Sequence, residues 1–314
     1  MNRKILVTGG AGFIASELAE RLIADKDNYV VIVDNLLTGN LGKLPLSKQD
    51  NWKFIKCDVN VRRDISEIMM AFRFDYVFHY AAMVGVQKTL LEPVNVLKDI
   101  DGIKNIVTLS KNTGVKRIYF SSSSEIYGEP VEFPQNEYTT PLNSRLPYAI
   151  VKNVGESFLR AYQQEFGLEF TIFRFFNTYG PKQSQHFVIS KFLIAALNNK
   201  DITIYGDGSQ TRTFCYITDN IDACLEAFYS DKLVNDVANI GNNKEIPILT
   251  LAQEIIRLTK SKSKIVHLPP LKEGDMLGRR PDIRKMKALI NKDLIPLEEG
   301  ISRILKHGLF ELKN

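Results

Sequence analysis

Short apolar runs alternate with amphipathic stretches over the first 180 residues of the chain. Runs of strand length lie at residues 5–7, 29–33, 54–58, 76–80, 117–121 and 170–175. Between most of them, apolar residues recur at helical spacing, at residues 13–24, 64–71, 94–111 and 148–166. This alternation predicts an α/β fold with a Rossmann-like, doubly wound parallel sheet that helices cover on both faces. Ligands of such sheets bind beyond the carboxyl ends of the strands.

The pattern changes after Gly180-Pro181. The sequence there predicts a helix at 187–198, a strand at 202–205, a turn at 206–209, a further helix from Thr218 and a closing helix at 297–309. We therefore expect residues 1–180 to form a Rossmann domain that binds the cofactor. Residues 181–314 form a smaller α+β lobe for the substrate, with segments of the two domains interleaved.

Composition narrows the class of protein. The 314 residues are 44% hydrophobic and 25% charged, which is ordinary for a soluble globular protein. The net charge of +5 is scattered, so no block of the kind that binds nucleic acid is present, and no apolar run reaches the ~18 residues of a membrane span. The three cysteines fit no metal-site spacing. Because the first strand starts at Lys4 and leaves no room for a signal peptide, we expect a cytoplasmic protein.

A glycine loop follows the first strand and opens a helix, which is the context of a dinucleotide fingerprint. Gly9 allows the tight turn, Gly12 lets backbone N–H groups approach a pyrophosphate, and the helix N-terminus adds partial positive charge. Asp34 ends the second strand, where a carboxylate accepts hydrogen bonds from both ribose hydroxyls and repels a 2′-phosphate. The loop and the carboxylate together predict NAD as the cofactor. Asp58 ends the next strand, where it either faces the adenine or caps a turn.

Tyr148 and Lys152 stand one helical turn apart, downstream of a run of four serines, residues 121–124. An alcohol gives up hydride easily only if a base takes its proton, and an ammonium group beside a phenol favours the phenolate. A serine hydroxyl can hydrogen-bond the reacting oxygen. The Tyr–Lys pair alone is common by chance, but with the glycine loop and the serines in this order it predicts hydride chemistry on a hydroxyl.

With these motifs, the chain resembles extended short-chain dehydrogenases/reductases of the nucleotide-sugar epimerase/dehydratase/decarboxylase group. The resemblance covers nearly the whole chain. Its motifs are the loop at 8–16, His79-Tyr80-Ala81-Ala82, Ser122-Ser123-Ser124-Glu125-Ile126-Tyr127-Gly128, Tyr148-x-x-x-Lys152, and the segments 174–181, 205–212 and 279–283. Two positions depart from the family pattern: Asp99 stands where asparagine is usual, and a Gly-Trp near residue 292 is absent. We expect both departures to matter for packing rather than chemistry.

The resemblance implies a role for each matching residue. Tyr148 is the implied base, Lys152 its activator and a ribose ligand, and Ser123 the contact to the sugar 4-hydroxyl; Ser124 and Glu125 complete the catalytic candidates. The cofactor candidates are Gly9, Gly12, Phe13, Ile14, Asp34, Asn35, Asp58, Val59, Ala81, Ala82 and Lys152. The substrate candidates are Asn177, Phe187, Val188, Tyr205, Arg212 and Arg279, with Asn177 and the two arginines on the pyrophosphate.

Members of the family share oxidation of a sugar at C4 by hydride transfer to NAD, and they differ in the step after it. Ser124 replaces the Asp with which nucleotide-sugar dehydratases expel water, and Glu125 resembles the Thr-Ser-Glu of UDP-glucuronate decarboxylases and GDP-mannose 4,6-dehydratases. We favour an enzyme that yields a 4-keto sugar or its dehydrated form. Decarboxylation of a UDP-glucuronate type of substrate and 4-epimerisation stay open, and an NAD-binding regulator without catalysis is a remote alternative.

The resemblance also implies partners. The helical stretches 94–111 and 148–166 resemble those that pair across this family's homodimer, with Ile100, Ile103, Val107 and Phe158 as core or interface residues. A nucleotide-diphosphate sugar is the expected substrate, and synthesis of surface polysaccharide is the expected setting.

Overall fold

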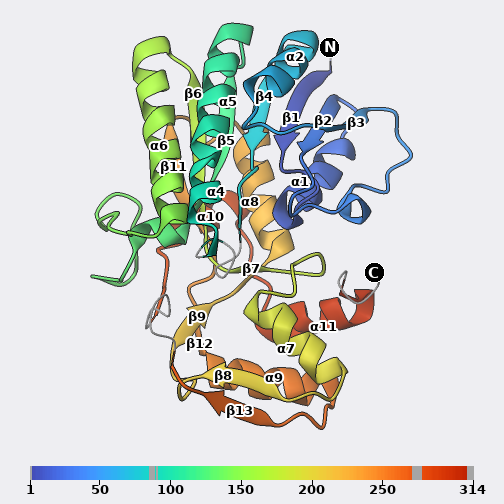
Figure 1. Ribbon diagram of the computed structural model, residues 1–314, viewed down its shortest axis with the longest axis vertical. Coiled ribbons are helices and arrows are strands. Elements are labelled where there is room, and N and C mark those ends of the chain that lie inside the picture. Colours follow the sequence, from blue (N-terminus) through green and yellow to red (C-terminus); the bar gives the residue numbers. More distant parts are fainter. Residues whose placement is uncertain (1, 85–88, 90, 271–277, 310–314) are drawn as a thin grey trace. The chain divides into compact units, whose positions relative to one another are not determined.

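The glycine loop, Asp34 and the serine run lie at the ends of strands of a seven-stranded sheet (Figure 1). Its strand order is β11-β6-β5-β4-β1-β2-β3, and β3-β2-β1-β4-β5 pair in parallel. The strands are β1 (Arg3–Thr8), β2 (Asn28–Asp34), β3 (Trp52–Lys56), β4 (Tyr76–His79), β5 (Arg117–Ser123), β6 (Glu169–Phe175) and β11 (Asp236–Ile240). This computed structural model describes residues 2–84, 89, 91–270 and 278–309. The predicted Rossmann-like parallel sheet is confirmed.

Helices cover the sheet on both faces because its inner strands are apolar on both sides; Ile5, Leu6 and Val7 of β1 are all fully buried. One core joins strand residues to α2 (Arg62–Phe72), α5 (Asp99–Thr113) and α6 (Pro147–Phe166), which lie in front of the strands in Figure 1. On the other side lie α1 (Phe13–Ile23) and α8 (Ile217–Tyr229). Phe228 of α8 meets Phe78 and Tyr119 of the sheet edge-on. The strands are therefore held from two sides, and their carboxyl ends are fixed.

The chain divides into two units whose segments alternate along the sequence. The first contains Met1–Gly128, Leu142–Arg174 and Cys224–Ala238; the second contains Glu129–Pro141, Phe175–Ala223 and Asn239–Asn314. The second unit has three two-stranded pairs: parallel β7 (Thr178–Tyr179) with β10 (Cys215–Tyr216), antiparallel β9 (Thr211–Thr213) with β12 (Glu245–Pro247), and parallel β8 (Ile202–Tyr205) with β13 (Ile265–Leu268). Its helices are α7 (Val188–Leu197), α9 (Ile248–Thr259), α10 (Arg284–Ile290) and α11 (Leu297–His307). Our assignment of NAD and substrate to residues 1–180 and 181–314 stays a prediction.

All six strands expected in the first 180 residues are present. The single helix expected at 94–111 is two helices, α4 (Pro93–Leu97) and α5, which are separated by Lys98. The short helical turns η1 (Leu41–Lys43) and η2 (Ser124–Tyr127), strand β11 and helix α9 were not predicted. Within the described residues, no helix is long and apolar enough to cross a membrane, and no cluster of His, Cys, Asp and Glu could hold a metal ion.

Candidate active site

The glycine loop brings two backbones together at the end of β1. Gly9 has φ +70°, and a Cβ there would lie 2.7 Å from the Cα of Ala81, just beyond β4. The N–H groups of Gly9 and Gly10 donate to the carbonyl of Val33 at 2.8 and 3.2 Å. Gly12 is the N-cap of α1 and provides no side-chain cap, so the first N–H groups of α1 have no capping side chain. These features fit a loop that binds pyrophosphate oxygens.

Asp34 lies directly beside this loop. Its Oδ2 accepts from Ala11 N at 3.0 Å and its Oδ1 from Leu36 N at 2.7 Å. Burial raises the pKa of Asp34, and the two backbone bonds oppose that rise. A Cβ on Gly39 would lie 2.6 Å from Oδ1, so glycine leaves room beside the carboxylate. The arrangement fits a ribose diol at this carboxylate.

The neighbouring cofactor candidates have mixed surroundings. The Asp58 carboxylate accepts from Asn60 N at 2.9 Å and from Asn35 Nδ2 at 3.1 Å, so it caps its own turn and ties the ends of β2 and β3 together. The side chain of Val59 packs in the core beneath the sheet. Phe13 and Ile14 are the half-buried first residues of α1. The cofactor roles of these residues and of Ala81 and Ala82 stay predictions.

A buried threonine–histidine pair aligns the ends of β1 and β4. Thr8 Oγ1 accepts from the N–H groups of Tyr80 and Ala81, both at 3.1 Å, and lies 2.9 Å from His79 Nδ1. Burial lowers the pKa of His79 to about 3, so the ring is neutral. Because Thr8 uses its lone pairs on two N–H groups, its hydroxyl donates to Nδ1. From the sequence, His79 was only part of a motif, and its role in this pair was not predicted.

Lys152 is buried, with 3% of its surface exposed. Its Nζ donates to Ser121 O at 2.6 Å and to Ser121 Oγ at 3.3 Å, and lies 5.8 Å from the centre of the Tyr148 ring. Burial lowers the pKa of Lys152 to about 8, and the carboxylate of Asp99 opposes that fall. Most of the lysine population is therefore charged at neutral pH.

Tyr148 lies within reach of the predicted serine. Burial raises the pKa of Tyr148, a hydrogen bond with Ser123 lowers it, and the carboxylates of Glu125 and Asp99 raise it. Ser123 Oγ also accepts from Glu125 N at 3.2 Å, as the cap of η2. The chain alone therefore keeps the phenol protonated.

Asp99 is a further member of this electrostatic group. It was expected to matter for packing, and it does: its Oδ2 accepts from Met83 N at 2.7 Å, and its Oδ1 from Asn60 Nδ2 at 3.3 Å. Its charge also acts on Lys152 and on Tyr148. The packing role agrees with the expectation, and the influence of Asp99 on these two pKa values was not predicted.

A buried ion pair beneath the serine run was not predicted. Glu156, one turn beyond Lys152 on α6, accepts from Ser122 Oγ at 2.7 Å and from Arg174 Nε at 2.9 Å. Arg174 Nη2 donates to the other carboxylate oxygen at 2.7 Å, and Nη1 donates to the hydroxyl of Tyr127 at 2.8 Å. The sequence signal was present, since Tyr148, Lys152 and Glu156 are spaced by four residues and share one face of a helix.

All six substrate candidates lie in the second unit. Asn177 has φ +27°, and its buried Nδ2 has no hydrogen-bond partner among the described residues. Arg212 lies on β9, and Arg279 follows Gly278, where a Cβ would lie 3.1 Å from Thr211 Oγ1. The structure therefore brings the segments of the two arginines side by side. The other candidates are Phe187 and Val188 at the start of α7 and Tyr205 at the end of β8.

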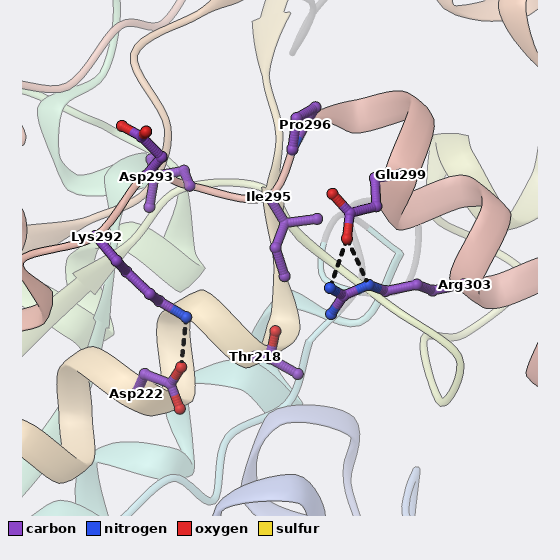
Figure 2. Close-up of a pocket in the computed structure, with 9 residues that line it drawn as sticks. Thr218, Asp222, Lys292, Asp293, Ile295, Pro296, Glu299 and Arg303 are labelled. Carbon is purple, nitrogen blue, oxygen red and sulfur yellow. Dashed lines mark hydrogen bonds and ion pairs between the residues drawn. The ribbon is translucent and has the colours of Figure 1, made fainter.

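A hollow in the second unit lies elsewhere, between the start of α8 and the segment leading into α11 (Figure 2). Lys292 Nζ contacts Asp222 at 2.6 Å, and Arg303 Nη2 contacts Glu299 at 2.5 Å. None of the six substrate candidates lines it. Its two cations, Lys292 and Arg303, are each paired with a carboxylate of the same lining.

Comparison with known proteins places the chain among nucleotide-sugar enzymes. Residues 5–241 match the family model described as "NAD dependent epimerase/dehydratase family". The UDP-glucuronic acid decarboxylase 1 of Danio rerio is 33% identical, over 99% of this chain and 74% of its own. A UDP-N-acetyl-alpha-D-glucosaminuronate decarboxylase of Bacillus cytotoxicus is 35% identical, over 92% of each chain. The crystal structure of a UDP-glucose 4-epimerase from Thermotoga maritima with UDP-glucose is 32% identical and covers 97% of this chain and 98% of its own, with a TM-score of 0.90.

Replacing Asp34 tests the ribose site. Asp34→Asn removes the charge that accepts the two ribose hydroxyls, so we expect NAD to bind about tenfold more weakly and the discrimination against NADP to shrink. Isothermal titration with NAD and with NADP measures both effects. Asp50→Asn removes the same charge from an exposed position of the same unit and is the matched control. Asp50→Asn should bind both cofactors as the wild type does. If Asp34→Asn also binds NAD and NADP as the wild type does, the ribose assignment is wrong.

Proposed function

The chain belongs to the NAD-dependent epimerase/dehydratase family, and from this premise we propose that its reaction begins with oxidation of the C4 hydroxyl of a UDP-sugar. The placement of Tyr148 and Lys152 one helical turn apart on α6, with Lys152 Nζ held on Ser121 and 5.8 Å from the centre of the Tyr148 ring, carries the proposal. Tyr148 takes the proton of the C4 hydroxyl, and Ser123 hydrogen-bonds the same oxygen. Lys152, held on Ser121, adds positive charge beside the phenol.

NAD, when bound, supplies the acceptor for the C4 hydride and a second positive charge near the phenol. The residues that would hold it are the glycine loop, Asp34 and Lys152. Gly9, Gly12 and Gly39 each stand where a Cβ would lie less than 3 Å from a neighbouring atom, which fits a cradle shaped for close approach.

Decarboxylation of a UDP-hexuronic acid is the second step that we propose. Once C4 is a ketone, the C6 carboxylate is that of a β-keto acid. The C5–C6 bond then breaks, carbon dioxide leaves, and the electron pair moves to the C4 oxygen as an enolate. Hydrogen bonds from Ser123 and Tyr148 to that oxygen stabilise the enolate, so the same two groups serve both steps. Protonation of C5 and return of hydride to C4 complete the cycle.

Two observations support decarboxylation over dehydration or release of the ketone. The relatives at 33% and 35% identity are decarboxylases of UDP-hexuronic acids, and Ser124 stands where nucleotide-sugar dehydratases carry an acidic residue. The sequence alone favoured release of a 4-keto sugar or its dehydration, and the relatives move decarboxylation ahead of both. The second candidate is 4-epimerisation, which the likeness to the Thermotoga maritima epimerase favours.

The proposal is tested with a panel of UDP-glucuronate, UDP-N-acetylglucosaminuronate, UDP-glucose, UDP-N-acetylglucosamine, GDP-mannose and dTDP-glucose. Product mass identifies the reaction: loss of carbon dioxide means decarboxylation, loss of water means dehydration, loss of two hydrogens means release of the ketone, and an unchanged mass with a new sugar means epimerisation. We expect loss of carbon dioxide from one of the two uronates. In Tyr148→Phe, turnover should fall more than about a hundredfold while NAD still binds. Full turnover by that variant would refute Tyr148 as the base.

The charge of Asp99 sets the pH range of the reaction. Its carboxylate raises the pKa of Tyr148 and of Lys152. In Asp99→Asn both pKa values fall, so the phenolate forms at lower pH and the lysine loses its charge at lower pH. We expect the whole profile of kcat against pH to move down by up to about one unit. Asp101→Asn makes the same change in net charge at an exposed position of α5 and should leave the profile in place. If the two variants have the same profile, Asp99 does not act through its charge.

A homodimer that pairs through α4 and α6 is the proposed assembly. Ile103 and Val107 are 3% and 2% exposed and belong to the core of one chain. Exposed apolar side chains of these helices include Val94 (70%) and Leu97 (42%) on α4 and Ile150 (41%) near the start of α6. They offer an apolar face for a second copy.

Light scattering tests this face. The wild type should have about twice the 35.7 kDa mass of one chain, and Ile150→Arg should be monomeric because a guanidinium would be buried without a partner. Leu46→Arg, at an 88% exposed position of the first unit, is the control and should stay dimeric. A monomeric wild type would refute the assembly.

A further inference from the structure

The ion pair between Glu156 and Arg174 is almost fully enclosed, with 2% and 1% of these residues exposed. Three hydrogen bonds reach the carboxylate: Ser122 Oγ and Arg174 Nε at one oxygen, and Arg174 Nη2 at the other. No substrate or cofactor role was assigned to either residue. Glu156 nonetheless lies one helical turn from Lys152 on α6, and its partner Ser122 directly precedes Ser123.

The pair holds both ends of the segment that carries the catalytic candidates. Glu156 holds Ser122 at the start of the segment, and the guanidinium of Arg174 donates to the hydroxyl of Tyr127 at its end. Tyr127 is 1% exposed, and the guanidinium carbon of Arg174 lies 5.0 Å from the centre of its ring. Between these two anchors lie Ser123, Ser124 and Glu125, at the turn from β5 into η2.

A buried ion pair adds little net stability, because removing both charges from water costs about as much as their attraction returns. A pair of this kind does fix geometry, since each of its hydrogen bonds is directional and no water competes for it. Here the geometry that it fixes is the path of the backbone from Ser122 to Tyr127. The acceptor Glu156 is on α6, the same helix that carries Tyr148 and Lys152.

We propose that Glu156 and Arg174 are positioning residues that hold the Ser123 hydroxyl and the Glu125 backbone in register with Tyr148. The proposal rests on the proposed function, in which Ser123 and Tyr148 meet the same substrate oxygen. Neither residue touches the substrate. They act through Ser122 and Tyr127, so their loss should lower the rate of the chemical step and leave substrate binding in place.

Ser122→Ala tests the proposal most directly, because it removes the hydrogen bond from Ser122 to Glu156 and keeps the Glu156–Arg174 ion pair. We expect kcat on the substrate found with the panel to fall by about 5- to 100-fold, since small errors of position are costly in a reacting pair. KM should stay within about twofold of the wild-type value, because the variant leaves the contacts that bind the substrate unchanged. In the chain without ligands, hydrogen exchange at the amides of residues 123–128 should become faster. The exchange measurement needs no turnover, so it stays informative even if the proposed reaction is wrong.

Ser110→Ala is the matched control. Ser110 is a fully buried serine of the same unit, and its hydroxyl has no hydrogen-bond partner among the described residues. Its loss should change neither kcat nor the exchange of residues 123–128. An equal fall in kcat in both serine variants, or a Ser122→Ala enzyme with wild-type kcat and wild-type exchange, would overturn the proposal.

A double variant, Glu156→Leu with Arg174→Met, removes the pair and leaves no single buried charge, so the chain is expected to fold. Its kcat should fall at least as far as that of Ser122→Ala, and its residues 123–128 should exchange faster. Wild-type kcat in a folded double variant would also overturn the proposal. If the double variant does not fold, Ser122→Ala and its control decide the question.

Discussion

The end of β5 and one face of α6 are joined by side-chain contacts, and the candidate site depends on that junction. Two consecutive strand residues hydrogen-bond helix residues, in the pairs Ser121–Lys152 and Ser122–Glu156, and the next strand residue, Ser123, acts to lower the pKa of Tyr148. The helix residues are spaced by four, so they share one face. A shift of the helix by one residue would break both hydrogen bonds and change the position of Tyr148 relative to Ser123. The alignment of phenol, ammonium and hydroxyl is therefore a property of the junction rather than of any one residue.

The junction also sets the charges of the site. Burial makes each isolated charge costly, and the buried charges of the site have different partners. Glu156 and Arg174 neutralise one another through two hydrogen bonds, whereas Lys152 has hydroxyl and carbonyl oxygens of Ser121 as its nearest partners and only the more distant charge of Asp99. The positive charge of Lys152 is thus not neutralised by an ion pair, and in the proposed reaction it favours the phenolate of Tyr148. The ion pair contributes structure without adding net charge.

The sequence was sufficient to predict most strands of the sheet and the two local motifs of the site, the glycine loop and the Tyr148–Lys152 pair. Six strands could be predicted because each is a short run rich in apolar residues, and the inner ones are buried on both faces. Strand β11 could not be predicted, because its sequence, Asp236-Val-Ala-Asn-Ile240, is short and partly polar. Its neighbour in the sheet, β6, lies about sixty residues earlier in the chain, so the local sequence does not indicate the pairing. The Glu156–Arg174 pair was missed for a related reason. The four-residue spacing places Glu156 on the same helix face as Tyr148 and Lys152, but a charged residue on a helix is typical of a solvated surface, and the sequence does not identify Arg174 as its partner.

The raised pKa of Tyr148 has a consequence for the order of events. Burial and two carboxylates disfavour the phenolate, and Ser123 alone opposes them with a hydrogen bond. A protonated phenol cannot act as a base, so the proposed reaction requires more positive charge beside the ring. Lys152 supplies part of that charge, but its own pKa of about 8 shows that burial already weakens its hold on the proton. In the proposed reaction the remainder would come with the oxidised cofactor, so Tyr148 would become basic only when a hydride acceptor is present. Such a coupling would prevent the chain from polarising an alcohol that it has no means to oxidise.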